Sequence, residues 1–207
     1  FILLGVLLSV FVAIRNEMVK NEEDVLEGIT SSGDNYVHEL NLPIMEIDTL
    51  NPILTTNVQV QNILKLIYEP LVSFDKSDML TSCLATEWSE RDDLNWIVKL
   101  RKDVKWHNGT DFTADDVKFT IESIMDPDNG SENAPNYEDV QEINVVDDHT
   151  ITFKLDAPNV AFLDYMTMAI LPKHLLEGED MQESEFFRHP IGTGPYKLDS
   201  WDEGQAI

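Results

Sequence analysis

Residues 96–125 place a strand pattern, a tight turn and a helix start one after another, and this succession constrains the fold more than any other feature of the sequence. Every second residue of 96–100 is apolar, which is typical of a strand with one buried face. Asn108 and Gly109 favour a tight turn. Thr113 stands three residues before Asp116, an arrangement that satisfies free amides at a helix start. A strand and an amphipathic helix this close together predict a mixed architecture.

The same two patterns recur along the chain. Apolar residues at helical spacing indicate a helix over 57–68, and strict alternation indicates a hairpin arm at 150–155. The other expected elements are a strand at 36–42, a charged turn at 90–93, the first hairpin arm at 140–146, a helix over 160–171 and a glycine-rich bend at 192–196 that enters another strand. The predicted fold class is therefore α/β in the broad sense, a mixed α+β chain.

The first residues predict a targeting segment. Residues 1–14 are apolar apart from Gly5 and Ser9, and Arg15 ends the run. This is shorter than the about 20 residues of a membrane-spanning helix, and it matches the apolar part of a signal peptide. We expect 1–14 to be a signal peptide or an uncleaved membrane anchor and 15–35, rich in charged and small residues, to be a flexible tether. Both interpretations put the rest of the chain outside the cytoplasm.

The charge of the chain excludes some partners. Its 14 basic and 39 acidic residues give a formal net charge of −25, which repels nucleic acids and anionic lipid headgroups. The acidic residues are spread along the chain, which is typical of a solvated surface. Cys83 is the only cysteine, so no intramolecular disulfide can form, and its setting between Ser82 and Leu84 favours a small core residue over a catalytic thiol.

The common catalytic and metal-binding motifs are absent from the sequence. It has no Gly-x-Ser-x-Gly elbow, no Walker-type phosphate loop and no His-Glu-x-x-His. Five histidines are scattered singly: His38, His107, His149, His174 and His189. Each is interpreted as a surface or satisfied core histidine rather than a metal ligand. We therefore predict that the chain is not an enzyme, holds no metal and needs no cofactor.

A series of short motifs gives the chain a family resemblance. The motifs are IDTLNP at 47–52, IYEPL at 67–71, LATEW at 84–88, LRKDVKWHNGT at 100–110, FTADDV at 112–117, LPKHL at 171–175 and GTGPYKL at 192–198. Read in this order, they resemble the family 5 extracellular solute-binding proteins of ABC transporters, the oligopeptide, dipeptide and nickel binders. The similarity covers about residues 36–204.

The resemblance implies a class II periplasmic-binding-protein-like lobe with an extra subdomain. Family members have two lobes that close over a solute by hinge motion. By this resemblance, 36–56 with 190–207 belong to part of the first lobe, and 57–189 form its extra subdomain. We expect the chain to be an N-terminal fragment from which the second lobe is absent.

The resemblance also implies a ligand site made by two segments that share a groove. The predicted contacts are Glu46, Asp48, Thr49 and Asn51 in the first segment, and Gly192, Thr193, Gly194 and Tyr196 in the second. Glu46 or Asp48 is a candidate partner for a peptide amine, with a surface cap as the alternative. Main-chain hydrogen bonds would hold an extended peptide without strict sequence choice.

The implied function is binding of a solute, most often a peptide in this family, and its delivery to ABC transporter permease subunits. The expected protein is a monomer outside the cytoplasm, periplasmic or membrane-associated at the cell surface through its N-terminal segment, and has no nucleic-acid partner. The alternative is a membrane-tethered signalling or adhesion module that retains the fold without transport.

Overall fold

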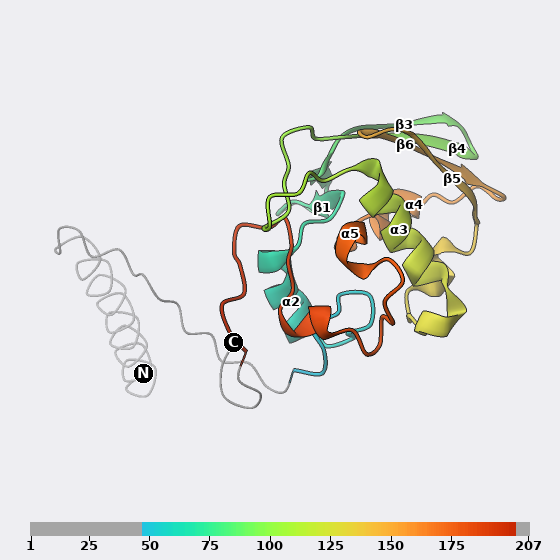
Figure 1. The fold of residues 1–207 in the computed structure, drawn as a ribbon. Helices are drawn as coiled ribbons and strands as arrows, with labels where there is room; N and C mark the ends of the chain where they lie inside the picture. Colours follow the sequence, from blue (N-terminus) through green and yellow to red (C-terminus); the bar gives the residue numbers. More distant parts are fainter. Residues whose placement is uncertain (1–46, 202–207) are drawn as a thin grey trace, which may run out of the picture. The chain divides into compact units, whose positions relative to one another are not determined.

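The computed structural model describes residues 47–201, which belong to one compact unit (Figure 1). Its strands are β1 (Val72–Phe74), β2 (Leu80–Ser82), β3 (Ala85–Asp92), β4 (Asn95–Leu100), β5 (Val140–Asp147) and β6 (Thr150–Leu155). Its helices are α2 (Val58–Ile67), α3 (Ala114–Met125), α4 (Phe162–Tyr165) and α5 (Lys173–Leu176), with short 3-10 helices η1 (Pro127–Asn129), η2 (Ala134–Tyr137) and η3 (Glu185–Arg188). This mixture confirms the predicted α/β class. Within the described range, no helix has the length and apolar character needed to cross a membrane.

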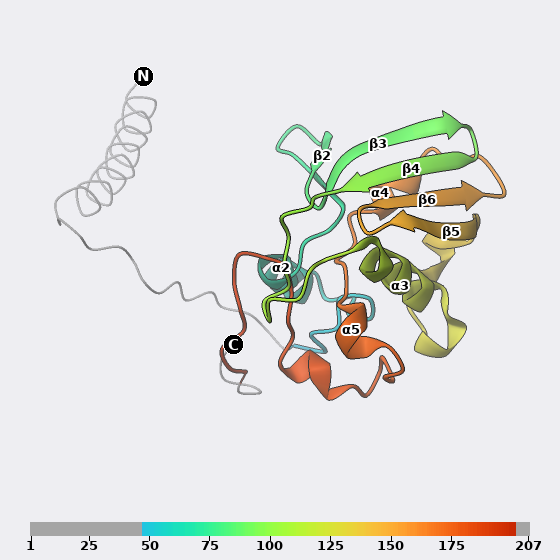
Figure 2. The same cartoon turned by 45° about the horizontal axis from the view of Figure 1, so that its top comes forward.

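Four strands form an antiparallel sheet in the order β3-β4-β6-β5 (Figure 2). The alternation predicted for β6 is present, because Ile151, Phe153 and Leu155 are at most 1% exposed while Lys154 is exposed. Cross-strand pairing with β4 places Trp96 opposite Phe153. The sheet therefore has one buried face and one face toward solvent.

Two helices pack on the buried face of this sheet. α3 contacts β5 and β6, and the Phe162 ring of α4 lies 5.3 Å from Phe153 and 5.7 Å from Trp96, measured between ring centroids. α3 begins with the expected capping box, in which the backbone N–H of Thr113 donates to the carboxylate of Asp116 at 2.9 Å. The helix ends at Met125, and Asp126 is both its C-cap and the N-cap of η1.

α2 lies away from the four-stranded sheet and confirms the helix expected over 57–68 (Figure 1). Asn57 caps its start, since the side chain accepts a hydrogen bond from a backbone amide of the first turn. Val60, Leu64 and Ile67 are buried on one face. Next along the chain, β1 and β2 form a separate two-stranded hairpin.

The helix expected over 160–171 was wrong, since only the short α4 forms there. After α4 the chain runs beside residues 69–72, which follow α2. Ala169 forms an isolated bridge with Pro70, and the backbone N–H of Ile170 donates to the carbonyl of Glu69 at 3.1 Å. These contacts with a distant segment take the backbone groups that a longer helix would use.

Two other local predictions need correction. The charged turn expected at 90–93 is shorter, because β3 continues to Asp92 and the Asp92 carboxylate accepts from the backbone amides of Leu94 and Asn95. The charged residues before it lie on an edge strand, where charge discourages pairing with another sheet. The bend at 192–196 is present, but no strand follows it up to residue 201.

The predicted division into a partial first lobe and an extra subdomain stays a prediction. Leu50 and Ile53, from the segment assigned to the first lobe, join the same hydrophobic core as Leu64 and Leu171 from the segment 57–189. The segments 1–14 and 15–35, the strand expected at 36–42 and the predicted contact residue Glu46 lie outside the described residues.

Candidate functional site

The first predicted contact segment folds against the start of α2. Asp48 is exposed, and both oxygens of its carboxylate accept from the hydroxyl of Thr55, at 2.8 and 2.9 Å. The Thr55 oxygen in turn accepts from the backbone N–H of Asn57, the residue that caps α2. The hydroxyl oxygen of Thr49 accepts from the backbone N–H of Asn51 at 3.1 Å. The fold therefore holds the Asp48 carboxylate at the surface in a defined orientation.

Asn51 lies inside the fold rather than on a surface. Its relative exposure is 0%, its side-chain NH₂ donates to the carbonyl of Met181 at 2.7 Å, and its side-chain oxygen accepts from the backbone N–H of Ile53 at 3.1 Å. A side chain in this position presents no free surface to a solute. Its predicted role as a ligand contact is untested, and its observed contacts connect the 47–55 segment to residue 181.

The second predicted contact segment packs on the last turn of α2. The backbone N–H of Gly194 donates to the carbonyl of Ile67 at 2.8 Å, and that of Tyr196 donates to the carbonyl of Leu66 at 3.0 Å. A Cβ atom at Gly192 would lie 1.8 Å from the Ile67 oxygen, and one at Gly194 would lie 2.6 Å from the Leu66 oxygen. The two glycines are therefore required by close backbone approach, not by a left-handed conformation.

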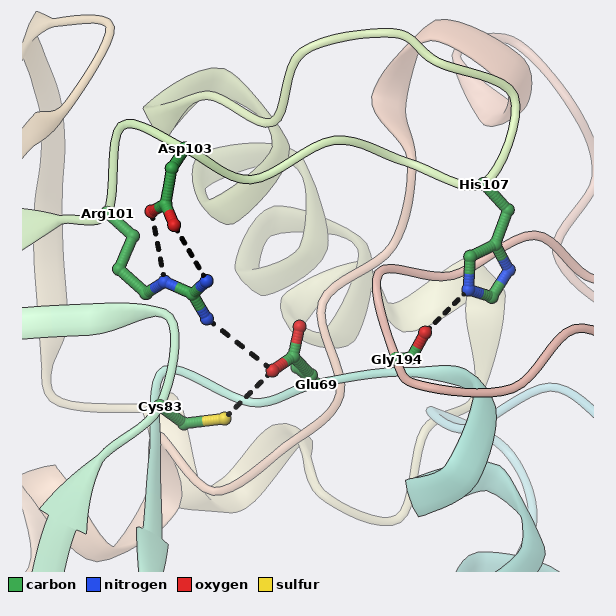
Figure 3. Close-up of polar contacts among 6 residues, drawn as sticks. All are labelled: Glu69, Cys83, Arg101, Asp103, His107 and Gly194. Carbon is green, nitrogen blue, oxygen red and sulfur yellow. Dashed lines mark hydrogen bonds and ion pairs between the residues drawn. The ribbon is translucent and has the colours of Figure 1, made fainter.

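His107 contacts this bend from the side opposite α2 (Figure 3). Its backbone N–H donates to the carbonyl of Gly192 at 2.9 Å, and its ring Nδ1 lies 3.2 Å from the backbone N of Gly192. Its Nε2 lies 2.8 Å from the carbonyl oxygen of Gly194. In addition, the Nζ of Lys197 donates to the His107 carbonyl at 3.2 Å. Sequence reasoning did not single out His107 beyond its place in the WHNGT motif.

The loop that carries His107 is attached to the core by its neighbour Trp106. The indole of Trp106 is 2% exposed, and its Nε1–H donates to the buried carboxylate of Asp116 at 3.2 Å. The same carboxylate accepts from the backbone N–H groups of Thr113 and Lys173, each at 2.9 Å. Burial raises the pKa of Asp116, and the hydrogen bonds from Thr113, Lys173 and Trp106 act in the opposite direction.

A second polar cluster lies where the chain leaves α2 (Figure 3). The thiol of Cys83 donates to the carboxylate of Glu69 at 3.6 Å, and Arg101 lies 3.8 Å from the same oxygen. Arg101 also makes two 3.2 Å hydrogen bonds to Asp103. Burial, followed by the charge of Glu69, raises the pKa of Cys83 to about 11. The thiol is therefore protonated near neutral pH, which fits the prediction that Cys83 is not a reactive nucleophile.

The two predicted contact segments meet opposite ends of α2. Asp48 is connected through Thr55 to the first residues of the helix, and the bend is connected to Ile67, its last residue. Ten helical residues span about 15 Å. Within residues 47–201 no hydrogen bond joins the two segments directly, so a common groove stays a prediction.

A surface groove between α3, β5 and α5 lies apart from the predicted contact segments. Its lining includes Lys173, which forms ion pairs with Asp115 and Glu177, and Lys118, which forms an ion pair with Glu122. Both lysines of this groove are therefore in ion pairs, and its three carboxylates exceed them by one negative charge. Across residues 47–201, no three side chains of the metal-ligating types come together as a metal site.

Comparison with known proteins identifies the class. The protein fold matches a solved structure of NikZ from Campylobacter jejuni in complex with Ni(L-His), with a TM-score of 0.73, 38% identity, and coverage of 77% of this chain and 32% of that one. The oligopeptide-binding protein AppA from Bacillus subtilis is 33% identical over 182 residues, which are 84% of this chain and 33% of AppA. The glutathione-binding protein GsiB from Escherichia coli is 32% identical over 164 residues, which are 77% of this chain and 31% of GsiB. The chain thus has the fold of a part of a solute-binding protein.

The family follows from a match to a family model. The model of the bacterial extracellular solute-binding proteins, family 5 Middle, matches residues 80–207. This chain therefore belongs to the family 5 bacterial extracellular solute-binding proteins, which confirms the resemblance found in its motifs. It spans about one third of the length of the curated relatives that it matches.

Proposed function

We propose that this chain forms one side of the solute site of an extracytoplasmic binding protein that delivers a peptide to ABC transporter permease subunits. The family is named extracellular, and two of its relatives here are named for an oligopeptide and for glutathione. These names favour a binding protein over an enzyme. They give no support to the alternative of a signalling or adhesion module.

The observation that carries this proposal is the way the bend at 192–196 is held. Gly192 and Gly194 use their backbone amides and carbonyls for contacts with α2 and His107. The side chains of the bend available to a solute are therefore those of Thr193, which is half-buried, Pro195, which is exposed, and Tyr196, which is 62% exposed. An exposed tyrosine on a rigid backbone offers an apolar ring and a hydroxyl, a combination that is common in binding surfaces.

The exposed carboxylate of Asp48 is the second part of the proposed site. Among residues 47–201 its one side-chain donor is Thr55, which leaves it capacity to accept from a peptide amine. The remaining predicted contacts, Glu46 and Thr49, stay part of this proposal, while Gly192, Gly194 and Asn51 support the site from within the fold.

Delivery to a permease implies a protein outside the cytoplasm. We propose that residues 1–14 act as its signal peptide or membrane anchor and 15–35 as its tether, and that it works as a monomer. To test the location, the full-length protein is produced with and without residues 1–14. Protein isolated from the outer surface of the cells is then identified by mass spectrometry. Recovery of the protein only from the cytoplasm would contradict it.

A thermal-shift experiment tests the proposed function. The full-length protein is heated with a random nonapeptide library, with glutathione or with nickel and L-histidine. A ligand at about 100 times its Kd stabilises a protein by about 2.7 kcal/mol, which raises its Tm by several degrees. We expect this shift with the peptide library. Unchanged Tm values in all three arms would contradict solute binding of these kinds.

A variant assigns the shift to the proposed site. Tyr196→Ala should reduce the peptide-induced shift by at least half while leaving the Tm without peptide within about 2 °C, because its ring is largely exposed. Phe74→Ala is the matched control, since Phe74 is an exposed aromatic residue (49%) on the β1–β2 hairpin. An equal loss in both variants would argue against a role for Tyr196.

A further inference from the structure

We propose that His107 is a positioning residue of the solute site: as the neutral Nε2–H tautomer, it fixes the bend from which Thr193 and Tyr196 project. This inference rests on the proposed function, because it concerns the same site. It adds a residue that lies 85 positions before Gly192 in the sequence and belongs to a different loop.

The two ring contacts determine the protonation state of His107. A backbone N–H can only donate, so Nδ1, at 3.2 Å from the backbone N of Gly192, must be an unprotonated acceptor. A carbonyl oxygen can only accept, so Nε2, at 2.8 Å from the Gly194 oxygen, must carry the proton. Only the neutral Nε2–H tautomer makes both contacts. The other neutral tautomer reverses both polarities, and the imidazolium ion has no acceptor.

The contacts from His107 and α2 are complementary. The Ile67 carbonyl at the end of α2 accepts a hydrogen bond from the Gly194 amide. His107 makes hydrogen bonds with the Gly194 carbonyl and with both backbone polar groups of Gly192. All four backbone polar groups of the two glycines are thereby satisfied within the protein. Thr193, between them, has its backbone position set from both sides, and Tyr196 follows two residues after Gly194. Loss of the ring would leave the Gly192 amide and the Gly194 carbonyl without these partners, while the backbone N–H of His107 could still donate to the Gly192 carbonyl.

The loop of His107 is rigid enough to exert this control. Gly109 N–H donates to the carbonyl of Trp106 at 2.8 Å, and Trp106 N–H donates to the carbonyl of Thr110 at 2.9 Å, which closes the tight turn. The indole of Trp106 is buried against Asp116. His107 therefore extends from a turn that is closed by hydrogen bonds between Trp106, directly before it, and Gly109 and Thr110, two and three positions after it.

The test combines NMR with peptide binding on the full-length protein. Long-range ¹H–¹⁵N spectra of the histidine rings report the tautomer of His107, and the amide signals of Gly192 and Gly194 report the bend. We expect the Nε2–H pattern at pH 7. His107→Ala should shift both glycine amides and raise the half-saturating concentration of the nonapeptide library at least tenfold. His189→Gln, at an exposed histidine, is the matched control and should change neither.

Two conservative variants separate positioning from a general loss of stability. Asparagine places its amide near the position of Nδ1, so His107→Asn can still accept from Gly192 N–H. Glutamine places its amide near Nε2, so His107→Gln can still donate to the Gly194 carbonyl. In each variant we expect a wild-type amide signal only for the glycine that the new side chain still contacts. The peptide affinity of each variant should lie between those of wild type and His107→Ala.

The outcomes distinguish this inference from the proposed function. Absence of peptide binding by the wild-type protein would count against the proposed function, whatever the glycine signals show. Normal peptide affinity in His107→Ala, or an Nδ1–H or imidazolium pattern at pH 7, would overturn the role assigned to His107 while leaving solute binding intact.

Discussion

Replacing Asp116 by alanine tests how the fold supports the loop of His107. The carboxylate accepts three hydrogen bonds, from the indole of Trp106 and from the backbone amides of Thr113 and Lys173. Alanine leaves all three donors without a partner. A buried donor without a partner costs about 1–3 kcal/mol, and the two part-buried amides fall at the low end because water can reach them. We therefore expect Asp116→Ala to lower the free energy of unfolding by about 3–4 kcal/mol.

Urea denaturation followed by tryptophan fluorescence and far-UV circular dichroism measures this loss. For a chain of 150–250 residues it corresponds to a Tm lower by about 10 °C. Asp116→Asn retains one acceptor oxygen but turns an NH₂ group toward one of the donors, so it should lose about 1–2 kcal/mol. The intermediate value distinguishes loss of hydrogen bonds from loss of charge.

The neighbouring Asp115 provides the control. Its carboxylate is 51% exposed and pairs with the side chain of Lys173 at 3.2 Å. Such a surface pair contributes less than about 1 kcal/mol, so Asp115→Asn should be close to wild type. If Asp116→Ala and Asp115→Asn differ by less than about 1 kcal/mol, the reasoning that Asp116 connects three segments of the fold is refuted.

Two further predictions concern Cys83 and Gly192. With a pKa of about 11, the Cys83 thiol should react with iodoacetamide at pH 8 about 100-fold more slowly than an ordinary cysteine, and Glu69→Gln should move the rate profile to lower pH. A half-maximal rate near pH 8.5 in the wild-type protein would contradict this. Gly192→Ala should lower the free energy of unfolding by about 3 kcal/mol, because its Cβ would overlap the carbonyl of Ile67. Gly109→Ala should lose only about 1 kcal/mol, since Gly109 has φ +90° but open space around it; equal losses in urea denaturation would refute the steric argument.

Local patterns predicted the elements whose stabilising contacts are close in sequence. The capping box of α3 depends on Thr113 and Asp116, three residues apart, and the buried face of β6 depends on alternation within one strand. Both were predicted correctly for this reason. The apolar stretch 160–171 also resembled a helix locally, but Ala169 and Ile170 bond to residues about one hundred positions earlier. Local propensity cannot reveal such a competing partner.

In the candidate site, too, local sequence patterns did not reveal contacts with distant segments. The sequence indicated that the glycines at 192 and 194 allow an unusual backbone bend, but the reason is the proximity of Ile67 and Leu66, which belong to another element. Asn51 stood in a turn motif, and its sequence context did not indicate that its side chain would be buried against Met181; its role as a ligand contact stays a prediction. A turn motif identifies where the chain reverses, but it does not distinguish a side chain that faces solvent from one that faces the core.

The motifs at 100–110, 112–117 and 192–198 are connected by hydrogen bonds. Variants along this connection should distinguish effects on stability from effects on binding. Asp116 holds Trp106, and the next residue, His107, holds the bend at 192–196. Loss of Asp116 should therefore reduce both the free energy of unfolding and peptide affinity, because the turn that carries His107 loses its attachment to the core. Loss of the His107 ring should reduce affinity with a smaller effect on unfolding, since Trp106 and its carboxylate partner remain in place. An unfolding defect in Asp116→Ala without any change of the Gly192 and Gly194 amide signals would show that the Asp116–Trp106 contact and the contacts of His107 with the bend act independently.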